Sequence, residues 1–292
     1  MYRKFYTGEP DLQQIPGTGL SGEACVSRRV IVISPHIDDA AFSLASTLKL
    51  LVRAGSTVKI VNCFTLTRFA PFVGNERLTP MTRRRHEEEV FLHQLGGNSQ
   101  ADDLGLQDAP GRTGLGLRAV VIQPASARDI VVTALQLVER LERMGGDTTV
   151  LAPLAIGNHP DHYIARLAAL EKYRRLPIAF YEDLPYTASV AQDRVLSTVK
   201  ETGTMLGEDL QLVTVHWPGD FLWKRQCCSY YKSQISQAGI EKIVNYMQSN
   251  HGEKLWCSER FVNSWKWLWE SFGSLNHGPY LAAAACGEEA SF

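Results

Sequence analysis

The stretch RVIVIS, residues 29–34, decides the fold, because it is a short apolar, β-branched run without polar alternation. Such a run is typical of a strand covered on both faces, as in a parallel sheet. Apolar side chains then recur at helical spacing as far as Val52, and residues 57–64 form a second apolar run. The order strand, helix, strand predicts a β-α-β unit, whose right-handed crossover makes the two strands parallel.

The same alternation continues along the chain, and Ser126 is placed to cap one of the later helices. It predicts helices over 83–95, from 127 to 141 and over 160–173, and strands over 148–154 and 178–181. Strands that alternate with helices specify an α/β fold with three layers and a mostly parallel sheet.

The pattern weakens after residue 186, and all six tryptophans lie beyond residue 210. We therefore divide the chain into an N-terminal extension (1–28), a catalytic domain (29–186) and a smaller mixed C-terminal subdomain (187–292). The subdomain is expected to pack on the sheet edge or over the site. Its tryptophans Trp265, Trp267 and Trp269 suit either core packing or a platform that stacks on a sugar ring.

Composition excludes several classes of protein. The 292 residues carry 30 Lys and Arg against 31 Asp and Glu, a formal net charge of −1, which argues against a nucleic-acid binder. No apolar run approaches the ~18 residues of a membrane span, and the first residues lack an apolar signal core. Six cysteines without a C-x-x-C pair indicate buried thiols rather than a thiolate metal site. We expect a cytoplasmic enzyme.

Two clusters of acids and histidines follow predicted strands. The first is HIDD at residues 36–39, directly after the strand 29–34, and the second is HPDH at 159–162, beyond the strand 148–154. Ligands of open parallel sheets bind in the crevice outside the carboxyl ends of the strands. Because both clusters belong to that edge, we expect them to converge.

The residue types in these clusters suit a hydrolytic metal site. His36, Asp39 and His162 give two imidazoles and a carboxylate, a ligand set of catalytic zinc that leaves a position for water. The metal would lower the pKa of that water to ~7 and polarise a carbonyl. Asp38 is then free as general base, and His159 is placed to protonate the leaving nitrogen or to stabilise the oxyanion.

Each cluster also has a purely structural explanation. An Asp-Asp pair after a strand is common at a helix N-terminus, and Asp161 and His162 could simply begin a helix after Pro160. Tyr186 lies after the predicted strand 178–181 and would either line the crevice or close a turn at Pro185. Two clusters at strand ends favour a functional site over coincidental capping.

At these residues the sequence resembles the LmbE-like, or PIG-L, N-acetyl sugar deacetylases. The clusters are similar to the family signatures His-Pro-Asp-Asp-Glu and His-Pro-Asp-His, and the resemblance covers residues 29–186. It extends to Arg84-x-x-Glu87, to Leu95-Gly96 and to the stretch 180–186. The resemblance implies a Rossmann-like fold and the removal of acetyl groups from amino sugars with Zn²⁺.

Carried over residue by residue, the resemblance implies the same roles as the chemistry. His36, Asp39 and His162 match the metal ligands, Asp38 the general base and His159 the acid or oxyanion partner.

Arg84 matches a substrate-contacting arginine of the family, and Tyr186 is a second candidate substrate contact. Two positions depart from the family pattern, since Ile37 replaces a proline and Ala40 replaces a glutamate. The first removes loop stiffness, and the second removes a carboxylate that could orient a histidine.

We therefore expect a zinc-dependent hydrolase that cleaves the N-acetyl group of a small-molecule amino sugar or glycoconjugate. A place in antibiotic biosynthesis follows by analogy with the family. One alternative is a metal hydrolase acting on another amide or on a phosphoester. The other is a sugar-binding protein with a degenerate site, which the replacement of the family glutamate by Ala40 suggests. The complete ligand set argues against the last.

Overall fold

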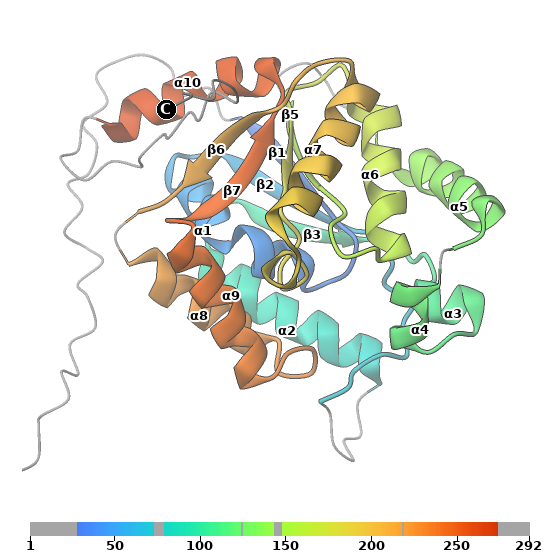
Figure 1. Cartoon of the computed structure of the whole chain (residues 1–292). Coiled ribbons are helices and arrows are strands. Elements are labelled where there is room, and N and C mark those ends of the chain that lie inside the picture. The colour runs from blue at the N-terminus through green and yellow to red at the C-terminus, as the bar shows by residue number, and fades with distance from the viewer. Residues whose placement is uncertain (1–27, 73–78, 124, 143–147, 218, 274–292) are drawn as a thin grey trace, which may run out of the picture.

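The computed structural model describes residues 28–72, 79–123, 125–142, 148–217 and 219–273, and the predicted extension lies almost entirely outside them. Within these residues the strands form a seven-stranded sheet in the order β3-β2-β1-β4-β5-β7-β6 (Figure 1). The strands are β1 (Arg29–Ser34), β2 (Thr57–Asn62), β3 (Ser99–Asp103), β4 (Thr148–Pro153), β5 (Ile178–Tyr181), β6 (Gln211–Val215) and β7 (Glu253–Cys257).

Helices connect and cover the strands. They are α1 (Asp39–Arg53), α2 (Pro80–Leu95), α3 (Ala109–Thr113), α4 (Leu117–Ile122), α5 (Ala127–Arg140), α6 (Pro160–Tyr173), α7 (Gln192–Leu206), α8 (Asp220–Tyr230), α9 (Gln237–Ser249) and α10 (Glu259–Gly273), with a 3₁₀ turn η1 (Thr187–Ser189). Ser126 caps α5 as predicted, since its side chain accepts the N–H of Asp129 at 3.1 Å. Among the described residues, no helix is both long and apolar enough to cross a bilayer.

The run 29–34 forms the middle of the sheet. β1 pairs in parallel with both β2 and β4, so that Val32 lies between Ile60 and Leu151. Its alternate side chains enter two cores. Val32 packs on the side covered by α1, α2, α8 and α9, and Ile33 on the side covered by α5, α6 and α7 (Figure 1). Burial on both faces explains why the run shows no polar alternation.

The chain after residue 186 adds to this same sheet. β7 pairs antiparallel with β5, and β6 pairs antiparallel with β7, so the sheet is mixed, with its parallel part at β1 to β5. Trp265 packs with Phe261 at a ring distance of 4.3 Å in the core, as expected for core packing. The side chains of Trp267 and Trp269 lie outside the described residues. A domain division at residue 186 stays a prediction.

Within residues 29–186, three elements were not predicted. β3 has the sequence SQADD, which lacks an apolar face because the strand is largely exposed at the sheet edge. The short helices α3 and α4 follow it. The cysteines within the described residues, Cys63, Cys227, Cys228 and Cys257, are buried and unpaired, as expected.

Candidate active site

The first cluster leaves the carboxyl end of β1. The backbone N–H of His36 donates to Asp39 Oδ2 at 2.8 Å, which folds the loop back on the start of α1. Asp38 stands at the N-cap position of α1, but its side chain makes no capping hydrogen bond. Instead Asp38 Oδ1 accepts from Arg84 Nη2 on α2 at 2.8 Å. Capping therefore does not account for the Asp38 carboxylate.

The second cluster follows β4 through a loop with unusual backbone angles. Ala155, Gly157 and Asn158 all have positive φ, of 65°, 97° and 61°. For residues other than glycine such angles are costly, and they concentrate at functional sites. The loop delivers His159 to the N-cap of α6, where Nδ1 accepts the N–H of Asp161 at 3.3 Å.

The structure brings the three predicted metal ligands together. The candidate donor atoms of His36, Asp39 and His162 all lie within 4.8 Å of one another. His162 Nε2 is buried 3.3 Å from Asp39 Oδ2, and no hydrogen bond from the described residues satisfies it. On the other side of the ring, Nδ1 donates to Asp183 Oδ1 at 2.6 Å. This bond leaves the lone pair of Nε2 available to a cation.

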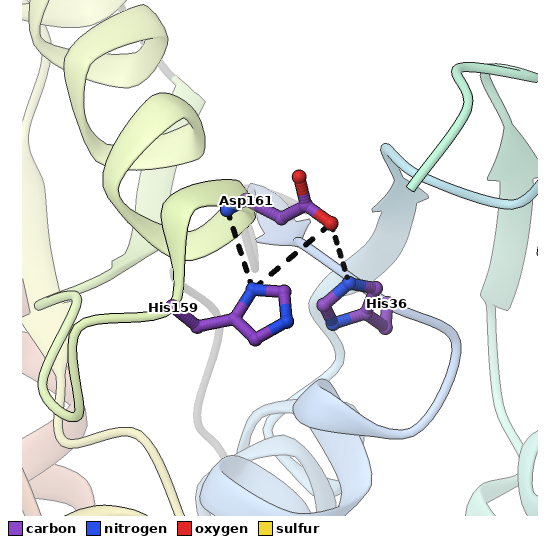
Figure 2. Close-up of side chains that lie close together, drawn as sticks. All are labelled: His36, His159 and Asp161. Atoms are coloured by element: carbon purple, nitrogen blue, oxygen red, sulfur yellow. Dashed lines mark hydrogen bonds and ion pairs between the residues drawn. The ribbon is translucent and has the colours of Figure 1, made fainter. Parts of the chain in front are cut away.

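A second group shares His36 with the first. His36, His159 and Asp161 also present donor atoms within 4.8 Å, and Figure 2 shows the Asp161 carboxylate next to both rings. Asp161 Oδ2 already accepts from His36 Nε2 at 3.0 Å and from the N–H of Ala109 at 2.9 Å. Its Oδ1 accepts from Arg112 Nη1 at 2.8 Å. Because both oxygens are occupied, Asp161 is better suited to hold His36 than to bind a metal.

Burial and charge set the protonation of the site. Burial would lower the pKa of His36, but the hydrogen bonds and charges of Asp161 and Asp39 raise it to about 10. Burial would raise the pKa of Asp39, but His162 and His36 lower it to about 2. Burial and the charge on His36 lower the pKa of His159 to about 3. His159 is therefore neutral at pH 7, and the carboxylate of Asp39 is ionised.

A pocket of about 790 Å³ opens onto these groups. It reaches His36, Asp38 and His159, and both predicted substrate contacts, Arg84 and Tyr186, line it. The remaining lining residues are Asp39, Phe42, Phe69, Pro71, Phe72, Asp108, Pro110, Gly116, Ala119, Pro185, Gln234 and Ile235.

Tyr186 lies on the site rather than in a remote turn. Its ring packs edge-on against His162 at 5.3 Å between centroids and lies 6.2 Å from His159. Gly157 makes room for it, since a Cβ at that position would lie 2.6 Å from Tyr186 Cβ. Tyr186 therefore lines the crevice, which is one of the two positions expected from the sequence.

Several residues of the site were not singled out from the sequence. Asp183 belongs to the family-like stretch 180–186 just after β5, but the sequence assigned it no role. Arg112 and Ala109 reach the site from a segment without any motif. Gln234 and Ile235 come from between α8 and α9, more than 70 residues beyond the second cluster. Only the folded chain places these residues at the site.

The fold and the site together define an α/β protein with a buried histidine–carboxylate centre at the carboxyl ends of parallel strands. Residues 31–173 match the sequence model of the PIG-L family, described as GlcNAc-PI de-N-acetylase. The segment that matches this family model contains both clusters, in agreement with the resemblance found in the sequence.

One known protein similar to the chain is a deacetylase. A 2'-N-acetylparomamine deacetylase from Streptomyces fradiae is 31% identical over 178 residues, which cover 59% of this chain and 63% of that protein. The match thus spans less than two thirds of the relative.

Two solved structures share the fold. One is a deacetylase–bog complex from the biosynthesis pathway of teicoplanin, with a TM-score of 0.55 at 20% identity, covering 79% of this chain and 99% of that one. The other is the A40926 pseudoaglycone deacetylase, with a TM-score of 0.52 at 22% identity, covering 80% and 98%.

Proposed function

We propose that this protein is a zinc-dependent hydrolase that removes the N-acetyl group of an amino sugar or glycoconjugate, releasing acetate and a free amine. The observation that carries the proposal is the approach of His36, Asp39 and His162 to within 4.8 Å beside Asp38, inside the PIG-L segment. The name of the S. fradiae relative supports an amino-sugar substrate and a place in antibiotic biosynthesis.

The donor set fits a zinc ion. His36, Asp39 and His162 would hold it. The Nε2 atom of His162 is buried without a hydrogen-bond partner among the described residues, so its lone pair is available to bind a cation. When bound, the metal polarises the acetyl carbonyl and makes a water more acidic. Burial raises the pKa of the Cys63 thiol, and the charges of Asp161 and Asp39 raise it further, so Cys63 stays a thiol.

Asp38 would act as the general base. Arg84 holds its Oδ1 at 2.8 Å, which fixes the carboxylate plane at the pocket wall and leaves Oδ2 to take the proton of the attacking water. The arginine thereby has a positioning role in addition to the substrate contact that the sequence predicts. Returning this proton to the departing nitrogen completes the hydrolysis.

His159 would stabilise the oxyanion. Its Nδ1 accepts the N–H of Asp161, so the neutral ring carries its proton on Nε2. Burial lowers the pKa of His159 to about 3, and the ring is therefore a neutral donor at pH 7. A neutral donor suits hydrogen bonding to a developing oxyanion better than full proton transfer.

Finer features of the fold are also proposals. The order β3-β2-β1-β4-β5 supports a Rossmann-like description of the parallel part. We also propose a division into a catalytic domain (29–186) and a C-terminal subdomain (187–292). The two parts share one sheet, because β7 of the subdomain pairs with β5 of the catalytic domain.

The first test is loss of acetyl, followed by mass spectrometry, from a panel of N-acetylated amino sugars with and without a chelator. We expect chelator-sensitive loss from at least one compound. His162→Ala should lose both metal and activity, whereas Asp38→Asn should keep the metal and lose roughly 10²- to 10⁴-fold in turnover.

His86→Ala is the matched control, because that histidine is exposed on α2 and its variant should behave as the parent. Substantial turnover by Asp38→Asn would remove Asp38 as the base. Phosphatase activity with inert N-acetyl sugars would replace the proposed reaction.

A further inference from the structure

A chain of charged side chains leads from His36 to the start of α5. His36 Nε2 donates to Asp161 Oδ2 at 3.0 Å, and Arg112 Nη1 donates to Asp161 Oδ1 at 2.8 Å. Arg112 in turn donates to Asp129 on α5, from Nε at 3.1 Å and from Nη2 at 3.2 Å. Arg112 and Asp129 are not among the described residues that line the large pocket, so contact with a substrate does not explain them.

Asp161 needs partners on both of its oxygens, because its side chain is completely buried. Its Oδ2 accepts from His36 and from the N–H of Ala109, whereas Oδ1 points away from the imidazole rings and accepts from Arg112 (Figure 2). The torsion that turns a carboxylate about its bond to Cβ has a broad minimum, so these partners set its orientation. Arg112 therefore keeps Oδ2 directed at His36.

The orientation of the His36 ring depends on the same carboxylate. The ring torsion of a histidine is also broad, so its hydrogen bonds decide where each nitrogen points. With Nε2 bonded to Asp161, the other nitrogen, Nδ1, lies 3.2 Å from Asp39 Oδ2. A carboxylate on one ring nitrogen fixes the tautomer of a metal-binding histidine and strengthens the other nitrogen as a ligand.

The contacts of Arg112 hold its guanidinium in one place. The side chain is only 12% exposed, and the guanidinium lies over the ring of Phe64 at 5.1 Å. Nη1 also donates to the carbonyl of Gln107 at 2.7 Å. The two bonds to Asp129 use the planar fork of donors that arginine offers and lysine lacks. Arg112 is therefore a fixed support behind Asp161.

We propose that Arg112 is a positioning residue of the metal centre, which holds Asp161 against His36 and so directs His36 Nδ1 to the metal, and that Asp129 anchors Arg112. This inference rests on the metal site of the proposed function. The competing explanation is that Arg112 only fastens α3 to α5 and α6. In that case its replacement would change stability and leave His36 unaffected.

The first test measures the Kd for zinc by competition with a fluorescent chelator. Arg112→Gln removes the charge and the fork, and we expect the Kd to rise about 10-fold, the lower end of the effect of partners that contact a metal ligand directly. Arg112→Lys keeps a charge that can reach Asp161 at one point, so a smaller rise is expected. Asp129→Asn should also raise the Kd, because it weakens the anchor.

Arg174→Gln is the matched control. Arg174 is exposed at the opposite end of α6 from Asp161, and its Nη2 donates to the carbonyl of Met205 at 3.0 Å. Its replacement should leave the Kd for zinc at the value of the parent protein. Unfolding in urea is measured for every variant. If Arg112→Gln does not fold, Arg112→Lys and Asp129→Asn decide, and an unchanged Kd in these folded variants would overturn the inference.

The second test requires neither metal nor turnover. In metal-free protein labelled with ¹⁵N-histidine, the proton on His36 Nε2 should exchange slowly with water, because it is bonded to the buried Asp161. His36→Gln identifies this NMR resonance by removing it. We expect exchange at least about tenfold faster in Arg112→Gln, where the carboxylate is free to turn, and no change in Arg174→Gln. A purely structural role of Arg112 would not alter this proton in a folded variant.

The results separate this inference from the proposed reaction. The expected rise in Kd, without acetate release from any compound, would support the role of Arg112 and overturn the deacetylation. Acetate release, with a Kd and an exchange rate that no folded variant of Arg112 changes, would do the opposite. A parent protein that binds no zinc would overturn both the metal site and the role of Arg112 in it.

Discussion

Asp183 organises the site although it reaches neither the pocket nor, in the proposed mechanism, the metal. It is buried at the end of β5, where Oδ1 accepts from His162 Nδ1 at 2.6 Å and Oδ2 accepts the N–H of Ile156 at 3.0 Å. The first bond fixes the tautomer and ring orientation of His162. The second ties the loop before α6 to the same carboxylate. Partners of this kind strengthen metal binding by orienting the ligand.

Replacing Asp183 by asparagine should therefore weaken the metal site. Either orientation of the amide places an NH₂ group against one of two N–H donors, so one bond is lost. We expect the Kd for zinc to rise about 10- to 100-fold, measured by competition with a fluorescent chelator. Asp193→Asn, at an exposed position on α7, is the control. An unchanged Kd in a folded Asp183→Asn protein would show that His162 needs no such support.

The sequence predicts the reactive groups of the site but not their partners. His36, Asp38 and His162 stand out because each belongs to a compact motif after a strand. The partner of Asp38 is Arg84 from α2, and that of His162 is Asp183 from the end of β5. Such pairs join segments whose distance in space depends on the whole sheet, and no local pattern encodes them.

At the scale of elements, a buried ion pair joins α1, α8 and β7. Glu253 accepts from the N–H groups of Ser46 and Thr47 at 2.9 and 2.8 Å and pairs with Lys224. Lys224 also donates to the carbonyl of Phe42 at 2.8 Å. Both charges are almost completely buried, so each depends on the other.

Glu253→Gln should be strongly destabilising, because it leaves the Lys224 ammonium buried without a counter-charge. We expect the free energy of unfolding in urea to fall by about 3–5 kcal/mol. Arg225→Gln provides the comparison, since its partner Glu241 is at the surface and little change is expected. Equal effects of the two substitutions would mean that the buried pair is no more important than the surface pair.

The predictability of an element follows its burial. β1 is buried on both faces and α1 has a broad buried face, so their patterns are clear in the sequence. β3 is an edge strand with the sequence SQADD and shows no pattern. The sequence did not predict that β7 joins the main sheet. Its pairing with β5 connects residues far apart in the chain, for example Phe180 and Trp256.

At the scale of the whole molecule, the metal would fasten two distant parts of the chain. His36 and Asp39 lie at the start of α1, whereas His162 lies on α6, across the carboxyl edge of the sheet. A ligand that binds only the folded state stabilises it by mass action.

Zinc at about 100 times its Kd should therefore add about 2.7 kcal/mol to the free energy of unfolding. The corresponding rise in Tm is several degrees for a chain of this size, and calorimetry with and without a chelator measures it. His162→Ala should show no difference between the two conditions. A Tm in the parent protein that is independent of zinc would contradict a site formed by these three residues.

The contact between Glu87 and Ser233 also joins two distant parts of the chain at the pocket. Glu87 lies inside the segment 31–173 that matches the PIG-L family model, whereas Ser233 lies beyond it. Glu87 on α2 supplies the two accepting oxygens, and the connection between α8 and α9 supplies the donors. The same connection brings Gln234 and Ile235 to the pocket. Substitutions at these two positions would therefore change the lining of the pocket while leaving His36, Asp39 and His162 in place.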